Sequence, residues 1–360
     1  MLPNLNLFRA IAALLVVLFH VPNFSSKAGL PYFNDWPIFN RGTEAVIFFF
    51  CLSGFLITHL MKEEIAAKSR VKVRNFYARR LLRIYPVYYL VIAIGVLLYH
   101  GILPLVSEDV GATSLIEYDL KYVLLYFILM VPNLVPYYLP GVFGILWSIG
   151  IEEQFYVFWP HLMNWFKKSI LPVCFLFFVI YFSVCFFTDI GRSFLVTKGM
   201  WFHFFAAGAL FSCFNEYRCS QFAKIIFSAQ FQMLMLLMMA TFICTDYFVF
   251  ESTPVNHLFQ GIFFSLFIFV FSLSQHKIFS VSSGFLNYLG KISYGIYMYH
   301  AIVINCMGGI FMLYVSKYVF EDLSVILFMN ISVFFGTIAL SAMSYSFYEK
   351  YFLDKSRHFR

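Results

Sequence analysis

The fold is decided by apolar runs such as residues 44–61, EAVIFFFCLSGFLITHLM, in which Glu44 is the only Asp, Glu, Lys or Arg. A helix that crosses a bilayer needs roughly 20 predominantly apolar residues. Comparable runs occupy residues 5–24, 82–100, 145–165, 170–188, 199–214, 226–249, 256–274, 290–314 and 322–346. The sequence therefore predicts an all-α integral membrane protein, a bundle of about ten transmembrane helices.

The composition excludes most other classes of protein. Of the 360 residues, 61% are hydrophobic and only 12% are charged, whereas an average soluble domain carries about 25% charged residues. This excludes a soluble enzyme, a disordered protein, a nucleic-acid-binding protein and a large water-soluble domain. The seven cysteines form no CxxC pair, so we interpret them as buried apolar side chains and expect no metal site.

The loop charges predict the topology. Segment 62–83 contains eight Lys or Arg and two Glu, and this excess marks it as cytoplasmic. Segment 120–136 contains two prolines. If it does not cross, Lys167, Lys168 and the basic end of the chain also fall inside. We therefore expect ten spans with both termini cytoplasmic, and segment 120–136 re-entrant or along the outer surface.

The remaining organisation is simple. Residues 1–349 are predicted to form one membrane domain, and residues 350–360 a short basic cytoplasmic tail. The N-terminus lacks the basic leader and clear cleavage site of a signal peptide, and its apolar run contains Arg9 and His20. We therefore expect it to be retained as the first helix of the bundle.

Ionisable residues at membrane depth are costly and are candidate functional groups. Arg9 and His20 lie eleven positions apart, which is close to three helical turns and roughly 16 Å along the axis. Both therefore project from similar faces, with Arg9 near the cytoplasmic entrance and His20 toward the outer leaflet. The alternative for His20 is an interfacial histidine near Pro22.

A pair of adjacent acids, Glu152 and Glu153, stands in LWSIGIEEQFYVFWP, residues 146–160. Ser148 and Glu152 are four residues apart and share a helix face, which Tyr156 continues. The alternative is a carboxylate at the outer interface beside an aromatic belt.

Arg80 and Arg83 are three residues apart, so both guanidinium groups can reach one anionic ligand, and arginine suits bidentate phosphate binding. The alternative is a purely topological role with lipid phosphates. Glu44, Ser53 and His300 are weaker single signals, and His300 could be a hydrogen-bonded histidine of the bundle.

Five segments, in this order, resemble the acyltransferase family 3 membrane proteins, which O-acylate bacterial envelope glycans. They are NLFRAIAALLVVLFH (6–20), FFFCLSGFLIT (48–58), FYARRLLRIYP (76–86), LWSIGIEEQFYVFWP (146–160) and ISYGIYMYHAIVI (292–304). Many members carry an acid just before the second motif, where this chain has Ile47, with Glu44 one turn earlier. The chain resembles the stand-alone type, without an SGNH-hydrolase-like domain.

The resemblance implies an O-acetyltransferase of the bacterial inner membrane. Its donor would be cytoplasmic acetyl-CoA, and its acceptor a sugar hydroxyl of O-antigen or lipopolysaccharide, capsule or exopolysaccharide, or a lipid-linked saccharide. It places the catalytic histidine on His20 and the first acidic position of the glutamate motif on Glu152, with Glu153 beside it. The donor would be held by the cationic side chains of Arg9, Arg80 and Arg83.

Other interpretations stay open at this point. Ser53 and Ser148 could carry an acyl group covalently, and the acyl group could be other than acetyl or the acceptor a small molecule. A transporter or flippase of glycan precursors would use Arg9, His20 and Glu152 as a proton relay, but it predicts paired broken helices in two halves, which the sequence does not show. The oligomeric state is not predicted.

Overall fold

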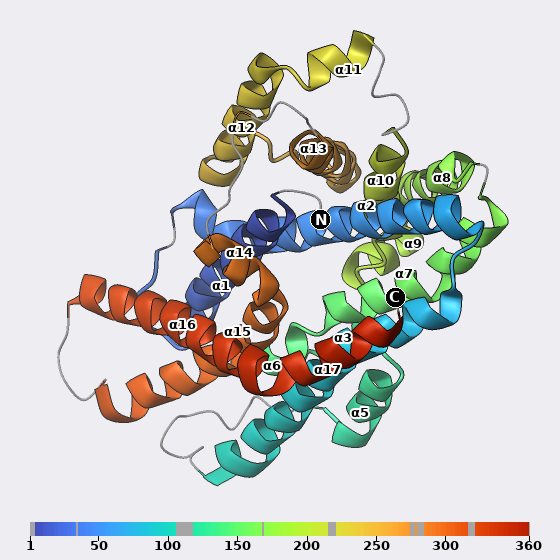
Figure 1. The fold of residues 1–360 in the computed structure, drawn as a ribbon. Helices are drawn as coiled ribbons and strands as arrows, with labels where there is room; N and C mark the ends of the chain where they lie inside the picture. Colours follow the sequence, from blue (N-terminus) through green and yellow to red (C-terminus); the bar gives the residue numbers. More distant parts are fainter. Residues whose placement is uncertain are drawn as a thin grey trace. The chain divides into compact units, whose positions relative to one another are not determined.

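A computed structural model describes residues 4–33, 35–105, 118–167, 169–214, 221–273, 278, 284–315 and 321–359. These residues form helices joined by turns and contain no β-strand (Figure 1). Helices satisfy their backbone hydrogen bonds internally, as a lipid environment requires. The expected all-α membrane fold is therefore confirmed. Lys168 and the last residue of the predicted tail, Arg360, lie outside the described residues.

Six helices in the described residues are long and apolar enough to cross a membrane. They are Leu5–Lys27, Gly42–Lys68, Val73–Leu105, Thr253–Leu273, Ser293–Leu313 and Asp322–Phe359. A seventh span is present if α9 (Asp189–Thr197) and α10 (Phe202–Cys213), which are bent by 76°, cross together.

Three other predicted spans form helices outside this set. Residues 145–165 contain α7 (Trp147–Trp165), and residues 170–188 and 226–249 contain the shorter α8 (Leu171–Phe187) and α12 (Ala229–Cys244). The total of ten spans stays a prediction.

The described chain divides into two compact units. Unit 1 comprises Met1–Ala12, Thr43–Val73 and Ile151–Gly290, and unit 2 comprises Ala13–Gly42, Arg74–Gly150 and Lys291–Arg360. Helix α1 (Leu5–Lys27) begins in unit 1 and ends in unit 2, whereas α7 begins in unit 2 and continues from Ile151 in unit 1. The other helices of unit 1 are α2 (Gly42–Lys68), α8 to α10, α11 (Gln221–Ile226), α12, α13 (Thr253–Leu273) and α14 (Gly284–Lys291).

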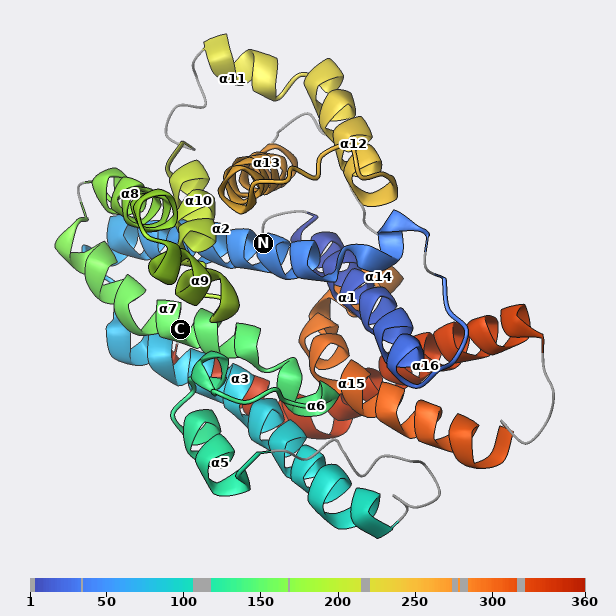
Figure 2. The ribbon, with the colours of Figure 1, turned by 180° about the vertical axis from the view of Figure 1, so that it is seen from behind.

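Unit 2 contains the helices on which most of the expected basic and histidine residues lie. Its helices are α3 (Val73–Val96), α5 (Leu120–Ile128), α6 (Gly141–Gly144), α15 (Ser293–Ile310), α16 (Asp322–Ser344) and α17 (Lys350–Ser356). π-Helical turns follow three of them, at Leu97–Ile102, Phe311–Val315 and η6 (Tyr345–Glu349). Helices α15 and α16 pack along one another, as both views show (Figures 1 and 2).

Two glycines allow α2 and α10 to pack closely within unit 1. A Cβ atom on Gly54 would lie 2.0 Å from the carbonyl oxygen of Phe205, and one on Gly208 would lie 1.9 Å from that of Cys51. Small residues at helix interfaces permit this approach in membrane proteins. Gly54 belongs to the FFFCLSGFLIT segment, so this contact also fixes the position of Ser53 on α2.

The end of α7 lies beside the segment that follows α2, in the same unit. Asn164 Oδ1 accepts a hydrogen bond from the Val71 amide at 2.8 Å, and Asn164 Nδ2 donates to the Val71 carbonyl at 3.1 Å. Lys167 Nζ donates to the Ser69 carbonyl at 3.3 Å. These contacts agree with a topology in which Lys167 and segment 62–83 share one side of the membrane.

Segment 120–136 contains the short helix α5 and a 3₁₀-helical turn at Pro132–Leu134, and α5 ends at Ile128 before a residue in the left-handed conformation, Met130 with φ 57°. Nine helical residues rise about 14 Å, less than half of a hydrocarbon core of roughly 30 Å. Helix α5 alone therefore cannot cross the membrane, which agrees with the expected path. The non-crossing topology stays a prediction.

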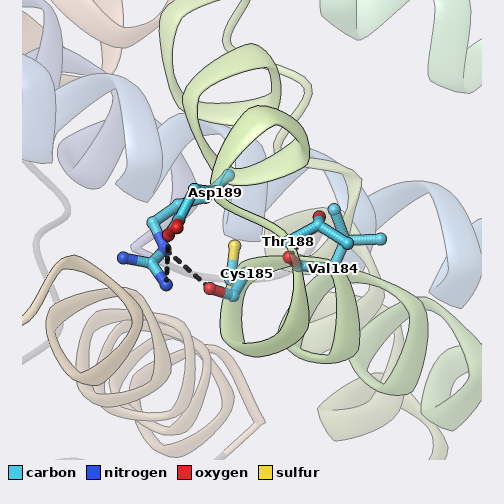
Figure 3. A network of polar contacts seen from close by, with 5 residues as sticks. Val184, Cys185, Thr188 and Asp189 are labelled. Carbon is cyan, nitrogen blue, oxygen red and sulfur yellow. Dashed lines mark hydrogen bonds and ion pairs between the residues drawn. The ribbon is translucent and has the colours of Figure 1, made fainter.

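The chain turns sharply between α8 and α9 in unit 1 (Figure 3). Arg192 Nε donates to the Cys185 carbonyl at 2.6 Å, and the Arg192 guanidinium lies 3.4 Å from Asp189. Thr188 Oγ1 donates to the Val184 carbonyl at 2.8 Å. These bonds satisfy carbonyl groups at the end of α8, so the helix stops after 17 residues.

Candidate functional site

The helices α1 and α15 of unit 2 bring two predicted site residues together. The imidazole rings of His20 and His300 lie with their centroids 4.8 Å apart and their planes inclined by 56°. Gly308 allows this approach because a Cβ atom there would lie 2.2 Å from the ring of Phe24, one turn after His20 on α1. We call His20 and His300 the histidine pair. His20 is half-buried, whereas His300 is completely buried.

Each ring of the histidine pair is held through its Nδ1 atom. His20 Nδ1 lies 2.8 Å from the Val16 carbonyl, and His300 Nδ1 lies 2.5 Å from the Tyr297 carbonyl. A carbonyl only accepts hydrogen bonds, so Nδ1 carries the proton in both rings. A neutral imidazole with this tautomer presents Nε2 as the proton acceptor. The histidine pair can therefore supply a general base.

Tyr297, whose carbonyl accepts the hydrogen bond from His300, was not predicted as a site residue from the sequence. Its hydroxyl donates to the Ile145 carbonyl at 2.9 Å and lies 2.5 Å from Ser148 Oγ. Because the phenol has one proton, Ser148 is the donor in the second bond. Ser148 thus serves as a buried hydrogen-bond donor to Tyr297. The signal for Tyr297 was its place three residues before His300, on the same helix face.

A second predicted group forms in unit 1 around Glu152. Ser53 Oγ of α2 and the Tyr156 hydroxyl of α7 both donate to Glu152 Oε1, and the two hydroxyl oxygens lie 2.6 Å apart. We call these three residues the Glu152 cluster. The shared face of Glu152 and Tyr156 is thus confirmed, whereas the partnership with Ser53 joins positions 99 residues apart. The cluster is a carboxylate that accepts from two O–H groups.

The neighbouring Glu153 is buried, with 7% of its surface exposed. Adjacent helical residues project in different directions, so Glu153 faces away from the Glu152 cluster.

On the cluster's helix, Trp159 Nε1 donates to Thr58 Oγ1 at 3.0 Å and fixes α7 against α2. Glu44 lies in the first turn of α2, where the helix dipole favours a carboxylate. A catalytic role for Glu153 and an auxiliary role for Glu44 stay predictions.

The cationic residues divide between the two units. Arg80 and Arg83 lie on α3 in unit 2, and Arg9 lies on the first part of α1 in unit 1. The Arg80 guanidinium stacks over the ring of Phe76, 5.6 Å from its centroid. Arg83 is exposed. The Arg80–Arg83 pair thus offers one oriented and one accessible guanidinium to an anion.

Arg79, which precedes Arg80, has a structural role. Arg79 donates from Nη1 to the carbonyl of Phe359 at 2.6 Å, so it ties the end of the chain to α3. No group of three or more His, Cys, Asp or Glu side chains in the described residues could hold a metal ion.

The acyltransferase domain family Acyl_transf_3 matches residues 2–346 of the chain. The peptidoglycan O-acetyltransferase OatA of Listeria monocytogenes is 27% identical over 166 residues, which are 46% of this chain and 25% of the relative. A putative peptidoglycan O-acetyltransferase of Bacillus subtilis, YrhL, is 32% identical over 163 residues, 44% of this chain and 23% of the relative.

A putative O-acetyltransferase of Staphylococcus aureus is 29% identical over 170 residues, 44% of this chain and 24% of the relative. The matches thus span about a quarter of the length of these relatives. No solved structure shows significant similarity to the chain. The family match covers nearly the whole chain and includes every predicted site residue, so the chain belongs to the Acyl_transf_3 family of acyltransferase domains.

Proposed function

We propose that the protein is an O-acetyltransferase of the bacterial inner membrane, which transfers an acetyl group from cytoplasmic acetyl-CoA to a sugar hydroxyl of an envelope glycan. The observation that carries this proposal is the histidine pair, because it offers a base whose proton-accepting nitrogen is fixed by a backbone hydrogen bond. Membership of an acyltransferase family and relatives named as O-acetyltransferases support the class of reaction.

The proposed reaction is a direct transfer. The sugar oxygen attacks the thioester carbonyl, the new C–O bond forms as the C–S bond breaks, and Nε2 of His20 takes the hydroxyl proton. The thiolate of CoA leaves and receives that proton from His20, which returns the imidazole to its neutral form. His20 is the base because it is half-buried and accessible, whereas His300 is completely buried and supports it. A positioned base contributes roughly 10²–10⁴ in rate.

Ser148 is not favoured as a covalent acyl carrier. Ser148 Oγ donates to the phenol of Tyr297, which is not a base, whereas an acyl-accepting serine needs a base within reach. Ser53 Oγ donates to the Glu152 carboxylate, so a covalent step on Ser53 is the alternative to direct transfer. Within the proposal, Glu152 stabilises charge that develops during the transfer.

The donor is assigned to the Arg80–Arg83 pair together with Arg9. Coenzyme A carries several phosphate groups, and guanidinium groups bind phosphate through two parallel N–H bonds. The Arg80 guanidinium packs over the ring of Phe76. This contact restricts the Arg80 side chain before the donor binds, so less conformational entropy is lost on binding. The same site would accept other acyl-CoA thioesters, and the size of the space around the acyl carbon decides among them.

For the acceptor, the relatives' names make peptidoglycan the first glycan to examine. O-antigen or lipopolysaccharide, capsule and exopolysaccharide are the other envelope glycans with suitable hydroxyl groups. The test is mass spectrometry of each glycan from cells with the wild-type chain, with the His20→Gln variant and without the protein. An added acetyl group that appears only with the wild-type chain supports the proposal, and its absence from every glycan rejects it.

The activity assay uses membranes that contain the protein, labelled acetyl-CoA and the glycan. Label that enters the glycan as an alkali-labile ester, only when donor and acceptor are both present, is the expected result. Propionyl-CoA in place of acetyl-CoA tests the choice of acyl group. Movement of a glycan precursor across the membrane without ester formation would instead indicate the transporter function.

A further inference from the structure

The segment that follows α1 in unit 2, residues 28–41, takes no part in the proposed reaction. Helix α1 ends in a Schellman motif, in which the Leu30 amide donates to the Ser25 carbonyl at 2.8 Å and the Gly29 amide donates to the Ser26 carbonyl at 3.3 Å. Gly29 adopts a φ of 67°, which glycine does without strain. The chain therefore turns away from the helix at a defined point, on the side of the membrane that the predicted topology places outside.

Three aromatic side chains of this segment stack on one another. The ring centroids of Phe33 and Trp36 lie 5.8 Å apart with their planes inclined by 29°, and those of Phe33 and Phe39 lie 5.3 Å apart with an inclination of 27°. Offset stacking of nearly parallel rings is a favourable arrangement of aromatic side chains. Phe33 thus contacts both of the other rings, and we call the three residues the aromatic platform.

The aromatic platform has a fixed backbone and an exposed ring. Pro37 begins the 3₁₀-helical turn η1 (Pro37–Asn40), and the Phe39 amide donates to the Trp36 carbonyl at 3.0 Å. The Trp36 side chain is nevertheless 62% exposed, and its neighbour Asp35 and the last residue of the turn, Asn40, are exposed as well. A large ring held on a loop beside polar side chains is typical of a binding surface.

A short and closely packed stretch joins the aromatic platform to the histidine pair. Gly42, six residues after Trp36, belongs to the same unit, and a Cβ atom on it would overlap the ring of Phe19. The Phe19 ring meets the His20 ring edge to face, with centroids 4.9 Å apart. Six residues span at most about 20 Å, so a short oligosaccharide can contact the platform and His20 at the same time.

We propose that the aromatic platform binds a sugar ring of the acceptor glycan and thereby sets which part of the glycan reaches His20. This inference rests on the proposed function. A pyranose ring presents C–H groups on its face, which pack against an aromatic ring, and hydroxyl groups at its edge. The exposed side chains of Asp35 and Asn40 offer hydrogen-bonding partners to such hydroxyl groups. A glycan also meets the second requirement, because it can present a further hydroxyl to Nε2 of His20.

The test varies the acceptor concentration in the membrane assay, with acetyl-CoA saturating. The acceptors are a peptidoglycan tetrasaccharide and oligosaccharides released from O-antigen, capsule and exopolysaccharide. For Trp36→Ala we expect the acceptor KM to rise about tenfold, the effect of losing one stacked ring. The value of kcat and the KM for acetyl-CoA should change less than about twofold, because the platform touches neither the reacting atoms nor the donor.

Two comparisons keep the test decisive. Trp36→Phe retains an aromatic face, so its acceptor KM should rise less than about threefold. The matched control is Trp165→Ala, which removes an indole that is 75% exposed at the end of α7, and its acceptor KM should equal that of the wild type. The corresponding monosaccharide cannot reach from His20 to the platform, so its KM should be the same for the wild type and for Trp36→Ala.

Binding of the same oligosaccharides to the purified protein, without acetyl-CoA, separates the two claims. If the wild type binds one of them but transfers no acetyl, the proposed function fails, while a tenfold weaker Kd of Trp36→Ala still supports the platform. If the wild type transfers acetyl and Trp36→Ala keeps the wild-type acceptor KM, the platform is wrong and the proposed function stands.

Three other results also decide against the platform. A loss of inserted protein in Trp36→Ala without a change in acceptor KM would assign Trp36 to the aromatic belt at the membrane interface. An equal rise in KM for the oligosaccharide and the monosaccharide would mean that Trp36 acts through the fold. A wild type that binds none of the oligosaccharides and transfers no acetyl to them overturns both the platform and the proposed function.

Discussion

Replacing His20 by glutamine removes the proposed base while keeping a hydrogen-bonding side chain. His20 holds its Nδ1 proton on the Val16 carbonyl at 2.8 Å, and this bond directs Nε2 away from its own helix. The ring also packs against His300, with centroids 4.8 Å apart. A glutamine amide can donate to the same carbonyl, but it cannot accept a proton at neutral pH. The substitution thus separates proton transfer from packing.

The expected loss follows from that chemistry. General base catalysis contributes roughly 10²–10⁴ in rate, which corresponds to about 3–5.5 kcal/mol of the barrier. We expect kcat of His20→Gln to fall by this factor, while KM for acetyl-CoA changes less than about twofold, because a base acts in the transition state and not in donor binding. His20→Ala should be equally poor.

The assay is transfer of labelled acetyl from acetyl-CoA to envelope glycan, in membranes with matched amounts of each variant. The control is His100→Gln, since His100 lies outside the histidine pair and contacts the Tyr118 hydroxyl, 3.1 Å from its Nε2, and this variant should keep wild-type activity. Near-normal turnover of His20→Gln with the glycan would refute the assignment of the base, and a rise in KM for acetyl-CoA with kcat unchanged would place His20 in donor binding instead.

The remaining predictions concern the donor, the second acid and the topology. Arg80→Ala and Arg83→Ala should each raise KM for acetyl-CoA by about ten- to a hundredfold. Lysine at either position should restore activity poorly, because its ammonium group lacks the planar N–H pair of a guanidinium. The control is Arg74→Ala, which removes the same charge from an exposed position of the same helix and should leave KM unchanged. Full activity of the double alanine variant would leave topology as the only role of the pair. Glu152→Gln should lower kcat in the glycan assay, and unchanged turnover would remove Glu152 from the mechanism. In a cysteine-free background, Lys167→Cys should react with a membrane-impermeant thiol reagent only from the cytoplasmic side, and labelling from outside alone would contradict the ten-span topology.

Much of the fold could be predicted because lipid imposes few choices on a backbone. Uninterrupted apolar runs must become helices, and the runs at 5–24, 44–61 and 322–346 do form long ones. The turn between α8 and α9 could not be predicted, because it depends on local hydrogen bonds of Thr188 and Arg192 that no hydrophobic pattern encodes.

The candidate site, too, could be predicted from the sequence only in part. Motif resemblance and burial at membrane depth pointed to His20 and His300, and the structure places their rings together. The partners of Glu152 were only half predictable: Tyr156 follows from the helical repeat, whereas Ser53 comes from another helix. Long-range pairs of this kind depend on packing, which one sequence does not display.

Glu349 illustrates why the rest was missed. It stands in SYSFYEK, residues 344–350, near a basic end of the chain, where an acid is ordinarily solvent-exposed. In the structure Glu349 ends the π-helical turn η6 and is only 6% exposed, and a Cβ atom on Gly295 of α15 would lie 3.1 Å from its Oε1. Neither feature has a hydrophobic period that the sequence would reveal.

The central claim is that this chain catalyses acetyl transfer from acetyl-CoA to an envelope glycan, with His20 as the base. The most direct measurement is the formation of labelled O-acetyl ester by the purified wild-type protein and the His20→Gln variant, both in lipid vesicles with the same glycan acceptor. We predict ester formation that requires acetyl-CoA and falls by roughly 10²–10⁴ in the variant. Equal rates for the two proteins, or no ester with the wild type on any envelope glycan, would contradict the account.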